Sequence, residues 1–275
     1  MKKILSLVLA LTMLALCVVS FGSCKKNRSD WETIEKKGKF VCGITIYEPM
    51  NYYDADGNLT GFDTELAELV AEKLGVEVEF QEIDWGNKYA ELQSGNIDCI
   101  WNGFTSNSKD DDGIERSDKV DFTHAYLDNK QCVIVLSEDL DKYTTKASLA
   151  GKKAAVEKGS AGASFAKDAG ATLASELTSQ MGTFTELLGG AVDFIVVDKL
   201  LADNIVGQGD YTSLAVADID IEPEVYSIGC RKGSDFDEKI NEALIELLNE
   251  GEIERLAKKY GVRVTDSLLA MKDKD

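Results

Sequence analysis

The stretch YAELQSGNIDCI (Tyr89–Ile100) returns later in the chain as FTELLGGAVDFI (Phe184–Ile195). An aromatic residue, Glu-Leu, Gly, a branched aliphatic residue, Asp and Ile recur at the same offsets in both copies. Each copy has the pattern of a short helix that stops at a glycine and leads into a buried strand. The repeat predicts two similar α/β lobes, each with one such unit; a coincidence of helix–glycine–strand patterning is the alternative.

The residues that follow each copy are polar. The first copy runs on to Asn102, Gly103 and Thr105, and the second ends at Asp198. In open parallel sheets, ligands bind beyond the carboxyl ends of the strands. Two copies that face each other would therefore direct Asn102, Thr105 and Asp198 into one cleft between the lobes.

The segments around the first copy alternate between strand and helix patterns. The expected elements are a strand at 39–46, a helix at 62–74, a strand at 76–83, a helix at 87–96 and a strand at 97–103. Asp63 or Thr64 is expected to cap the first helix, and Gly75 to end it. This order predicts a mainly parallel sheet covered by helices. An amphipathic helix at 236–261, broken near Gly251, is expected to return and complete the first lobe.

The N-terminus has the pattern of an export signal. Two lysines precede an apolar run, followed by small residues and Cys24. The stretch FGSC resembles a bacterial lipobox, in which the cysteine becomes the lipidated first residue; plain secretion is the alternative. Removal of residues 1–23 leaves 28 basic against 49 acidic residues, a formal net charge of −21. Such a surface repels nucleic acid and anionic lipid, so we expect no nucleic-acid partner and membrane attachment only through the lipid.

An acidic stretch at 54–65 has the spacing of a calcium loop, with Asp54, Asp56, Asn58 and Glu65 at ligand positions 1, 3, 5 and 12. The sharp turn of an EF-hand needs glycine at position 6, where this chain has Leu59. We therefore interpret 56–58 as a tight turn and expect no metal and no cofactor.

The cysteines and the single histidine exclude several kinds of site. Cys42, Cys99, Cys132 and Cys230 lie in apolar, strand-like runs without a CxxC spacing. They are expected to be buried free thiols, with one or two disulfides as the alternative. His124 is the only histidine, which argues against zinc, and we interpret it as a structural or surface residue.

Five segments in order resemble the amino-acid-binding proteins of ABC importers, whose fold also occurs in the ligand domains of ionotropic glutamate receptors. They are YEPMNYYDADGNLTGFDTELAELVAEKLG, DCIWNGFT, ERSDKVDFTHAYL, VDFIVVD and IELLNEGEIERLAKKYG. The resemblance implies an α/β fold of the two-lobed, type II periplasmic-binding-protein class. The expected boundaries are a signal peptide at 1–23, a tether at 24–37, lobe 1 at 38–127 and 228–264, lobe 2 with both hinge crossings at 128–227, and a tail at 265–275.

The resemblance also implies how an amino acid would be held. Arg116 matches the arginine that binds the ligand carboxylate, and Asp198 matches the aspartate that binds its ammonium group. Other positions match ligand contacts through backbone or hydroxyl groups (Asn102, Gly103, Thr105, Ser160, Ala161, Gly162) or through aromatic rings that sandwich the ligand side chain (Tyr47, Trp85). No catalytic residue is implied.

Two departures from the family pattern bear on the ligand. The segment SNSKDDDGI between Thr105 and Arg116 is longer than the family usually has. Its Asp110-Asp111-Asp112 run is expected to form a solvated loop, with lining of the cleft mouth as the alternative. Members that bind basic ligands tend to carry an acid in the first strand, where this chain has Ile44-Thr45-Ile46, which favours a neutral or polar amino acid.

The sequence thus predicts a monomeric, membrane-tethered receptor outside the cytoplasm that captures an amino acid and delivers it to an ABC transporter permease without making or breaking a bond. One alternative is an enzyme on the same fold, similar to cyclohexadienyl dehydratases, for which Glu157 and His124 are the only candidate acids. The other is a sensor or adhesion lipoprotein.

Overall fold

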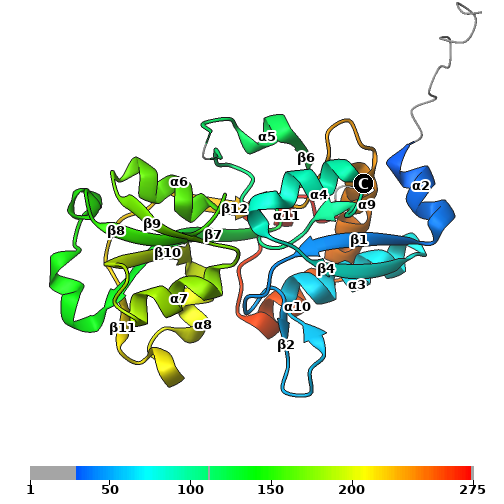
Figure 1. Ribbon diagram of the computed structural model, residues 1–275. Helices are drawn as coiled ribbons and strands as arrows, with labels where there is room; N and C mark the ends of the chain where they lie inside the picture. Colours follow the sequence, from blue (N-terminus) through cyan, green and yellow to red (C-terminus); the bar gives the residue numbers. More distant parts are fainter. Residues whose placement is uncertain (1–28, 111, 274–275) are drawn as a thin grey trace, which may run out of the picture.

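A computed structural model describes residues 29–110 and 112–273; the signal segment and Cys24 lie outside the described residues. The described chain forms two lobes that lie side by side in Figure 1, each built on its own mixed sheet with helices on both faces. The predicted α/β class and the two lobes are confirmed. Parallel pairing accounts for three neighbouring strands in each sheet, and antiparallel strands complete both.

The first sheet has the strand order β4-β1-β5-β13-β6. Its strands are β1 (Lys39–Ile44), β4 (Glu77–Glu82), β5 (Cys99–Ile100), β6 (Val120–Phe122) and β13 (Gly229–Arg231). β1 pairs in parallel with β4 and β5, whereas β13 runs antiparallel between β5 and β6. β13, which connects β6 to the other strands of this sheet, therefore comes from the last quarter of the chain.

The second sheet has the order β11-β7-β10-β8-β9, and β12 also pairs with β7. Its strands are β7 (Leu127–Leu136), β8 (Lys153–Glu157), β9 (Thr172–Leu177), β10 (Phe194–Asp198), β11 (Leu214–Val216) and β12 (Pro223–Tyr226). β7 leads out of the first lobe and β12 leads back to it, and the two strands pair antiparallel. Two neighbouring segments thus connect the lobes.

Alternation along the strands explains why helices cover both faces of the second sheet. Val133 and Val196 point to the face covered by α6 (Ala161–Asp168), while Ile134 and Val197 point to the face covered by α7 (Gln180–Leu188) and α8 (Lys199–Ile205). Successive side chains of a strand project to opposite faces, so a strand buried on both sides is a continuous apolar run.

The remaining helices are α2 (Asp30–Lys37), α3 (Phe62–Leu74), α4 (Lys88–Ser94), α5 (Arg116–Lys119), α9 (Phe236–Asn249), α10 (Glu252–Tyr260) and α11 (Asp266–Leu269). Short 3-10 helices occur at η1 (Trp85–Asn87), η2 (Ser137–Lys142), η3 (Lys146–Leu149) and η4 (Gly209–Tyr211). The predicted break in the C-terminal helix is confirmed, because Gly251 separates α9 from α10 with a φ of 80°. None of the helices in the described residues has the length and apolar character that a membrane crossing requires.

The two copies of the repeat have the same local structure. α4 and α7 are followed by Gly95 and Gly190, both with left-handed backbone, before β5 and β10 begin. The aspartate of each copy then accepts a backbone N–H at the start of the neighbouring parallel strand. Val41 donates to Asp98 Oδ2 at 3.0 Å, and Lys153 donates to Asp193 Oδ2 at 2.7 Å. The repeated aspartate therefore fixes the strand register in each lobe.

The acidic stretch divides into a hairpin turn at 54–58 between β2 (Tyr52–Tyr53) and β3 (Leu59–Thr60) and the first turn of α3 at 62–65. The carboxylate of Asp54 accepts the backbone N–H groups of Asp56 and Asn58, which closes the predicted turn. In residues 29–110 and 112–273, no three His, Cys, Asp or Glu side chains are grouped so that they could hold a metal ion.

The predicted cap of α3 was wrong. Gly61 occupies the N-cap position, and no side chain caps the helix. Asp63 points inward instead, where its carboxylate accepts the backbone N–H of Gly103 at 2.7 Å and the hydroxyl of Tyr126 at 2.8 Å. Gly75 ends the helix in left-handed conformation, as predicted.

The four cysteines of the described residues are buried free thiols. Cys42 and Cys99 are partners on adjacent parallel strands, with their sulfur atoms 3.5 Å apart, and Cys230 pairs with Cys99 from β13. Burial raises the pKa of the Cys99 and Cys230 thiols well above the ordinary value.

Candidate functional site

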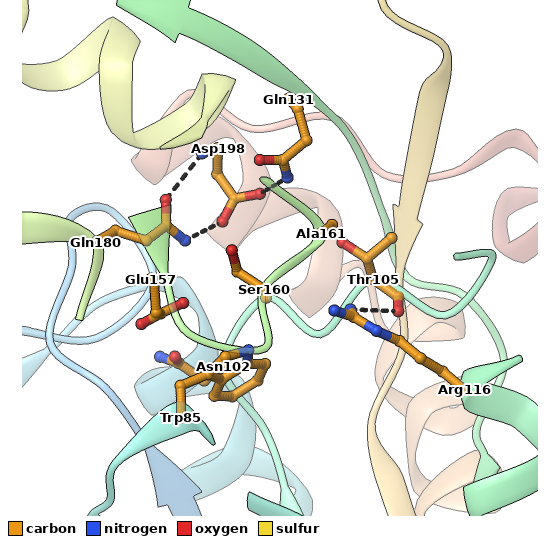
Figure 2. Close-up of a pocket in the computed structure, with 11 residues that line it drawn as sticks. Trp85, Asn102, Thr105, Arg116, Gln131, Glu157, Ser160, Ala161, Gln180 and Asp198 are labelled. Carbon is orange, nitrogen blue, oxygen red and sulfur yellow. Dashed lines mark hydrogen bonds between the residues drawn. The ribbon is translucent and has the colours of Figure 1, made fainter. Parts of the chain in front are cut away.

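A small cavity lies between the lobes, at the ends of β5, β8 and β10 (Figure 2). The first lobe contributes Trp85, Asn102, Gly103, Thr105 and Arg116, and the second lobe contributes Gln131, Glu157, Ser160, Ala161, Gln180 and Asp198. The structure thus brings together eight of the ten residues expected to contact a ligand. The free space is about 10 Å³, roughly what one water molecule needs, so a larger ligand can enter only when the lobes separate.

A wider hollow of about 790 Å³ adjoins the cavity and shares Gln131 and Ala161 with it. It runs between the loop residues 107–110 and 113 on one side and the α6 helix on the other. Ser164 Oγ of α6 donates to the carbonyl oxygen of Lys109 across this gap at 3.1 Å. The loop that lengthens the first lobe therefore reaches the second lobe.

Arg116 is the cation of the cavity wall and is 1% exposed. Its Nη1 donates to the carbonyl oxygen of Thr105 at 3.0 Å, and its Nη2 donates to that of Gly159 at 3.2 Å. Its Nε donates to Asp110 Oδ1 at 2.9 Å. These bonds occupy three of the five guanidinium N–H donors, and one donor on each terminal nitrogen is left for a bidentate carboxylate.

Asp110 departs from the expectation of a solvated loop. Its side chain is only 7% exposed and is paired with both Arg116 and Lys119. Burial by itself raises the pKa of Asp110, but the charges of Arg116 and Lys88 hold this pKa below its ordinary value. Asp112, two residues on, is exposed and bonds only at the surface with Lys119. The sequence has three consecutive aspartates at 110–112, and nothing in this run indicates that the first of them is buried.

Asp198 ends β10 and is held by amide groups. Its Oδ1 accepts from Asn129 Nδ2 at 2.7 Å and from Gln131 Nε2 at 2.6 Å, and its Oδ2 accepts from Gln180 Nε2. Burial raises the pKa of Asp198, and the Gln180 bond partly offsets that rise. Amide donors orient a carboxylate without neutralising it, so Asp198 can still attract a cation.

Two further ionisable groups stand next to the cavity. Lys88 is 1% exposed and donates to the carbonyl oxygens of Gly159 at 2.9 Å and of Trp85 at 3.4 Å; burial lowers its pKa to about 7. Glu224 is 9% exposed and accepts from Gln131 and Thr105. Burial and the charge of Asp198 raise the pKa of Glu224 to about 7.

Tyr47 and Gly162 are the two expected contact residues outside the cavity wall. Tyr47 lies beneath Gly103, and its hydroxyl is 3.5 Å from that of Tyr226. Gly162 packs against Gln131 and the Val196 carbonyl, where a Cβ would come within 2.9 Å of both oxygens. Both therefore support wall residues from behind.

Asn102 lines the cavity, but its side chain forms hydrogen bonds with residues of the first lobe. Nδ2 donates to the Thr45 carbonyl and to Asn51, and Oδ1 accepts from the Thr45 hydroxyl, all at 2.6–2.7 Å. Ser160 caps α6 by accepting the Ala163 N–H at 3.1 Å. The first N–H groups of a helix have no partner within it, so the turn at 160–162 suits an anion.

Three wall residues were missed as ligand contacts, and two of them had a signal. Gln180 precedes the second copy of the repeat by four residues, as Trp85 precedes the first, so extending the repeat backwards would have paired them. Glu157 ends the buried strand β8 with an acid, the same feature that singled out Asp198. Gln131 ends a run of four polar residues (128–131) in the first half of β7, so nothing set it apart from its neighbours. His124 does not line the cavity; its backbone N–H donates to Asn241.

Comparisons with known proteins bear on the fold and on the class of protein. Residues 40–263 match the family model of bacterial extracellular solute-binding proteins, family 3. The L-cystine-binding protein TcyA and the arginine-binding extracellular protein ArtP, both of Bacillus subtilis, are each 30% identical; the alignments cover 94% and 91% of this chain and 97% and 96% of those proteins. The amino acid ABC transporter substrate-binding protein AbpA of Streptococcus pneumoniae, solved bound to L-arginine, is 30% identical with a TM-score of 0.73, covering 88% of this chain and all of that one. All three are named as binding proteins, which agrees with the expectation that the chain is not an enzyme.

Proposed function

This chain belongs to the family 3 extracellular solute-binding proteins of bacteria and is the amino-acid-binding component of an ABC uptake transporter; we propose that it captures its ligand in the inter-lobe cavity while anchored to the membrane through lipidated Cys24. The observation that carries the proposal is the placement of Arg116 and Asp198 on opposite walls of one cavity, each buried. An amino acid has one carboxylate and one ammonium group, and these two residues complement them.

The remaining walls have matching roles in this proposal. The N–H groups at 160–162 assist Arg116 with the carboxylate, and Trp85 packs on the ligand side chain. Lobe 1 (38–127 and 228–264) closes on lobe 2 (128–227) about the β7–β12 crossings, and closure shields the charges from water. Binding is thereby coupled to the shape that the permease recognises. The protein acts as a monomer.

Calorimetry on residues 25–275 with each of the twenty amino acids and with L-cystine tests the proposal. We expect at least one to bind with a dissociation constant in the micromolar range or below. The ligand that binds should raise the melting temperature, because it stabilises the closed, folded form. If neither one of the twenty nor L-cystine binds, the cavity does not serve this function.

A further inference from the structure

Glu157 is the charged group of the cavity that the proposed roles do not use. It is the last residue of β8, it is 2% exposed, and it lines the cavity wall. Figure 2 shows its carboxylate turned towards Trp85 and Asn102, on the other side of the cavity from Arg116. It therefore lies beside the aromatic ring expected to contact the ligand side chain.

The two carboxylates of the cavity differ in how they are satisfied. Asp198 accepts bonds from the side chains of Asn129, Gln131 and Gln180. Oε1 of Glu157 is buried and has no hydrogen-bond partner among the described residues. A buried polar atom without a partner is uncommon in proteins, and each instance calls for an explanation such as a functional role or a bound water or ion.

The Glu157 carboxylate has a backbone hydrogen bond from Gln180, and the candidate charge partner within the protein is Lys88. It is close enough for its charge to lower the pKa of Glu157, but its two hydrogen bonds go to the carbonyl oxygens of Trp85 and Gly159. The dominant effect on Glu157 is burial, which raises its pKa well above the ordinary value. The charges of Lys88 and Arg116 and a backbone hydrogen bond from Gln180 thus compensate the charged form of Glu157 only in part.

The charge balance of the walls indicates what would compensate it. Among the described residues, the walls carry one cation, Arg116, against the two carboxylates Glu157 and Asp198. A zwitterion of zero net charge, held by Arg116 and Asp198, would leave Glu157 buried and unpaired. A ligand with a second positive group would pair with it.

We propose that Glu157 is the acceptor for a positively charged group at the end of the ligand side chain, so that the site selects basic amino acids. This inference rests on the proposed function and names the ligand class within it. It replaces the expectation of a neutral ligand, which was based on the first strand: here the acid comes from β8 in the second lobe. Trp85, next to Glu157, already has Lys88 Nζ 5.0 Å from its ring centroid, and a ring of this kind attracts cations.

The test compares pairs of ligands that share a backbone and differ in side-chain charge. Calorimetry measures L-arginine against L-citrulline and L-lysine against L-norleucine, for the wild type and for Glu157→Gln. We expect the wild type to prefer the charged member of at least one pair by 30-fold or more. Glu157→Gln should abolish that preference while the neutral member binds within threefold of its wild-type affinity.

The control variant is Glu176→Gln, which removes the same charge from an exposed position on β9 of the same lobe and should change no affinity. The melting temperature of the empty Glu157→Gln variant should equal or exceed that of the wild type, because a buried charge without a partner is removed. A lower melting temperature with unchanged selectivity would make Glu157 structural and overturn the inference.

Other outcomes separate this inference from the proposed function. If Glu157→Gln weakens charged and neutral ligands equally, Glu157 holds the α-ammonium group together with Asp198, and the selectivity assigned here is wrong. If the wild type prefers the neutral member of both pairs, the inference is likewise wrong, although the chain still binds amino acids. If no amino acid binds at all, the proposed function fails first and the inference fails with it.

Discussion

Lys88 and Arg116 donate to one acceptor, the carbonyl oxygen of Gly159, at 2.9 and 3.2 Å. Both cations belong to the first lobe, whereas Gly159 lies between β8 and α6 of the second. Two buried cations are thus held close together by a single backbone oxygen. These bonds exist only while the lobes are closed, so they connect ligand capture with closure.

Lys88→Met should weaken ligand affinity by about 10-fold without reducing the stability of the fold. Hydrogen bonds to charged groups contribute about 1.5–3 kcal/mol, and burial of the ammonium group offsets part of this. Small-angle scattering should show a smaller fraction of closed molecules at a given ligand concentration. Lys152→Met, at an exposed position of the second lobe, is the control and should behave as the wild type.

Arg116 and Asp198 should matter far more for binding than for folding. Removing either partner leaves a ligand charge buried and unpaired, which costs roughly 2–5 kcal/mol, or about 30- to several-thousand-fold in affinity. Arg116→Lys should fail almost as badly as Arg116→Ala, because an ammonium group cannot reproduce the bidentate fork. Calorimetry with the identified ligand decides this. Binding by Asp198→Ala within threefold of the wild type would place the site elsewhere.

Stability should fall as the pH rises, in part through Asp63. Burial raises the pKa of this carboxyl to about 7, against the lowering effect of Tyr126 and the Gly103 N–H. Above its ordinary value of 3.8 and up to about 7, the folded protein keeps a proton that the unfolded chain releases. The free energy of unfolding then decreases by roughly 1.4 kcal/mol per pH unit from this group, or about 4 kcal/mol across the range.

Asp63→Asn should remove that contribution, since an amide can still accept from the Gly103 N–H and donate to the Tyr126 oxygen. Urea denaturation at pH 4, 5.5, 7 and 8 measures it as the difference between wild type and variant. The difference isolates Asp63 from Glu157, Asp198 and Glu224, which titrate in both proteins. Parallel curves for the two proteins would contradict the assignment.

Gly103→Ala should destabilise the first lobe by about 2 kcal/mol or more. The residue has a φ of 54°, which costs a non-glycine residue roughly 1–2 kcal/mol, and its new Cβ would lie 1.8 Å from the Tyr47 hydroxyl oxygen. Adding Tyr47→Phe removes that oxygen and should restore part of the loss. Thermal denaturation of the two single variants and the double variant gives the coupling. If the stability changes of the two single substitutions simply add, the side chain at position 103 does not clash with Tyr47.

Cys24→Ala should release the protein from the membrane without changing ligand affinity. The proposed anchor depends on this cysteine alone, and a surface of net charge −21 in residues 24–275 would not hold to anionic lipid. Membrane fractionation after expression in a host with a lipoprotein pathway measures the effect. A variant that remains in the membrane fraction would overturn the lipoprotein proposal.

Sequence patterns predicted the parts of the fold in which local preference and tertiary packing agree. The repeat identified both helix–strand units, because Gly95 and Gly190 must end a helix wherever it packs. Asp63 was misassigned because an acid in the first turn of a helix is ordinarily a cap. Its actual partners, Gly103 and Tyr126, are distant in sequence.

The site was predictable where a polar residue ends an apolar strand, as at Asp198. Asp110 could not be recognised, because its burial depends on Arg116 and Lys119, which reach it from across the loop. Gln131 and Glu224 likewise acquire their surroundings only when β7 and β12 pair.

The position of β13 between β5 and β6 has a consequence for how the protein is made. The chain emerges from its N-terminus, and every strand of the second sheet precedes β13. β13 is the strand that pairs with β6 in the first sheet. This sheet therefore stays incomplete until the second lobe has passed through the export channel. We expect the second lobe to mature first outside the cytoplasm, with backbone amides of β8 and β10 gaining protection before those of β6 in pulsed hydrogen exchange. An importer component of this topology would then fold the second-lobe wall of its binding site before the first-lobe wall.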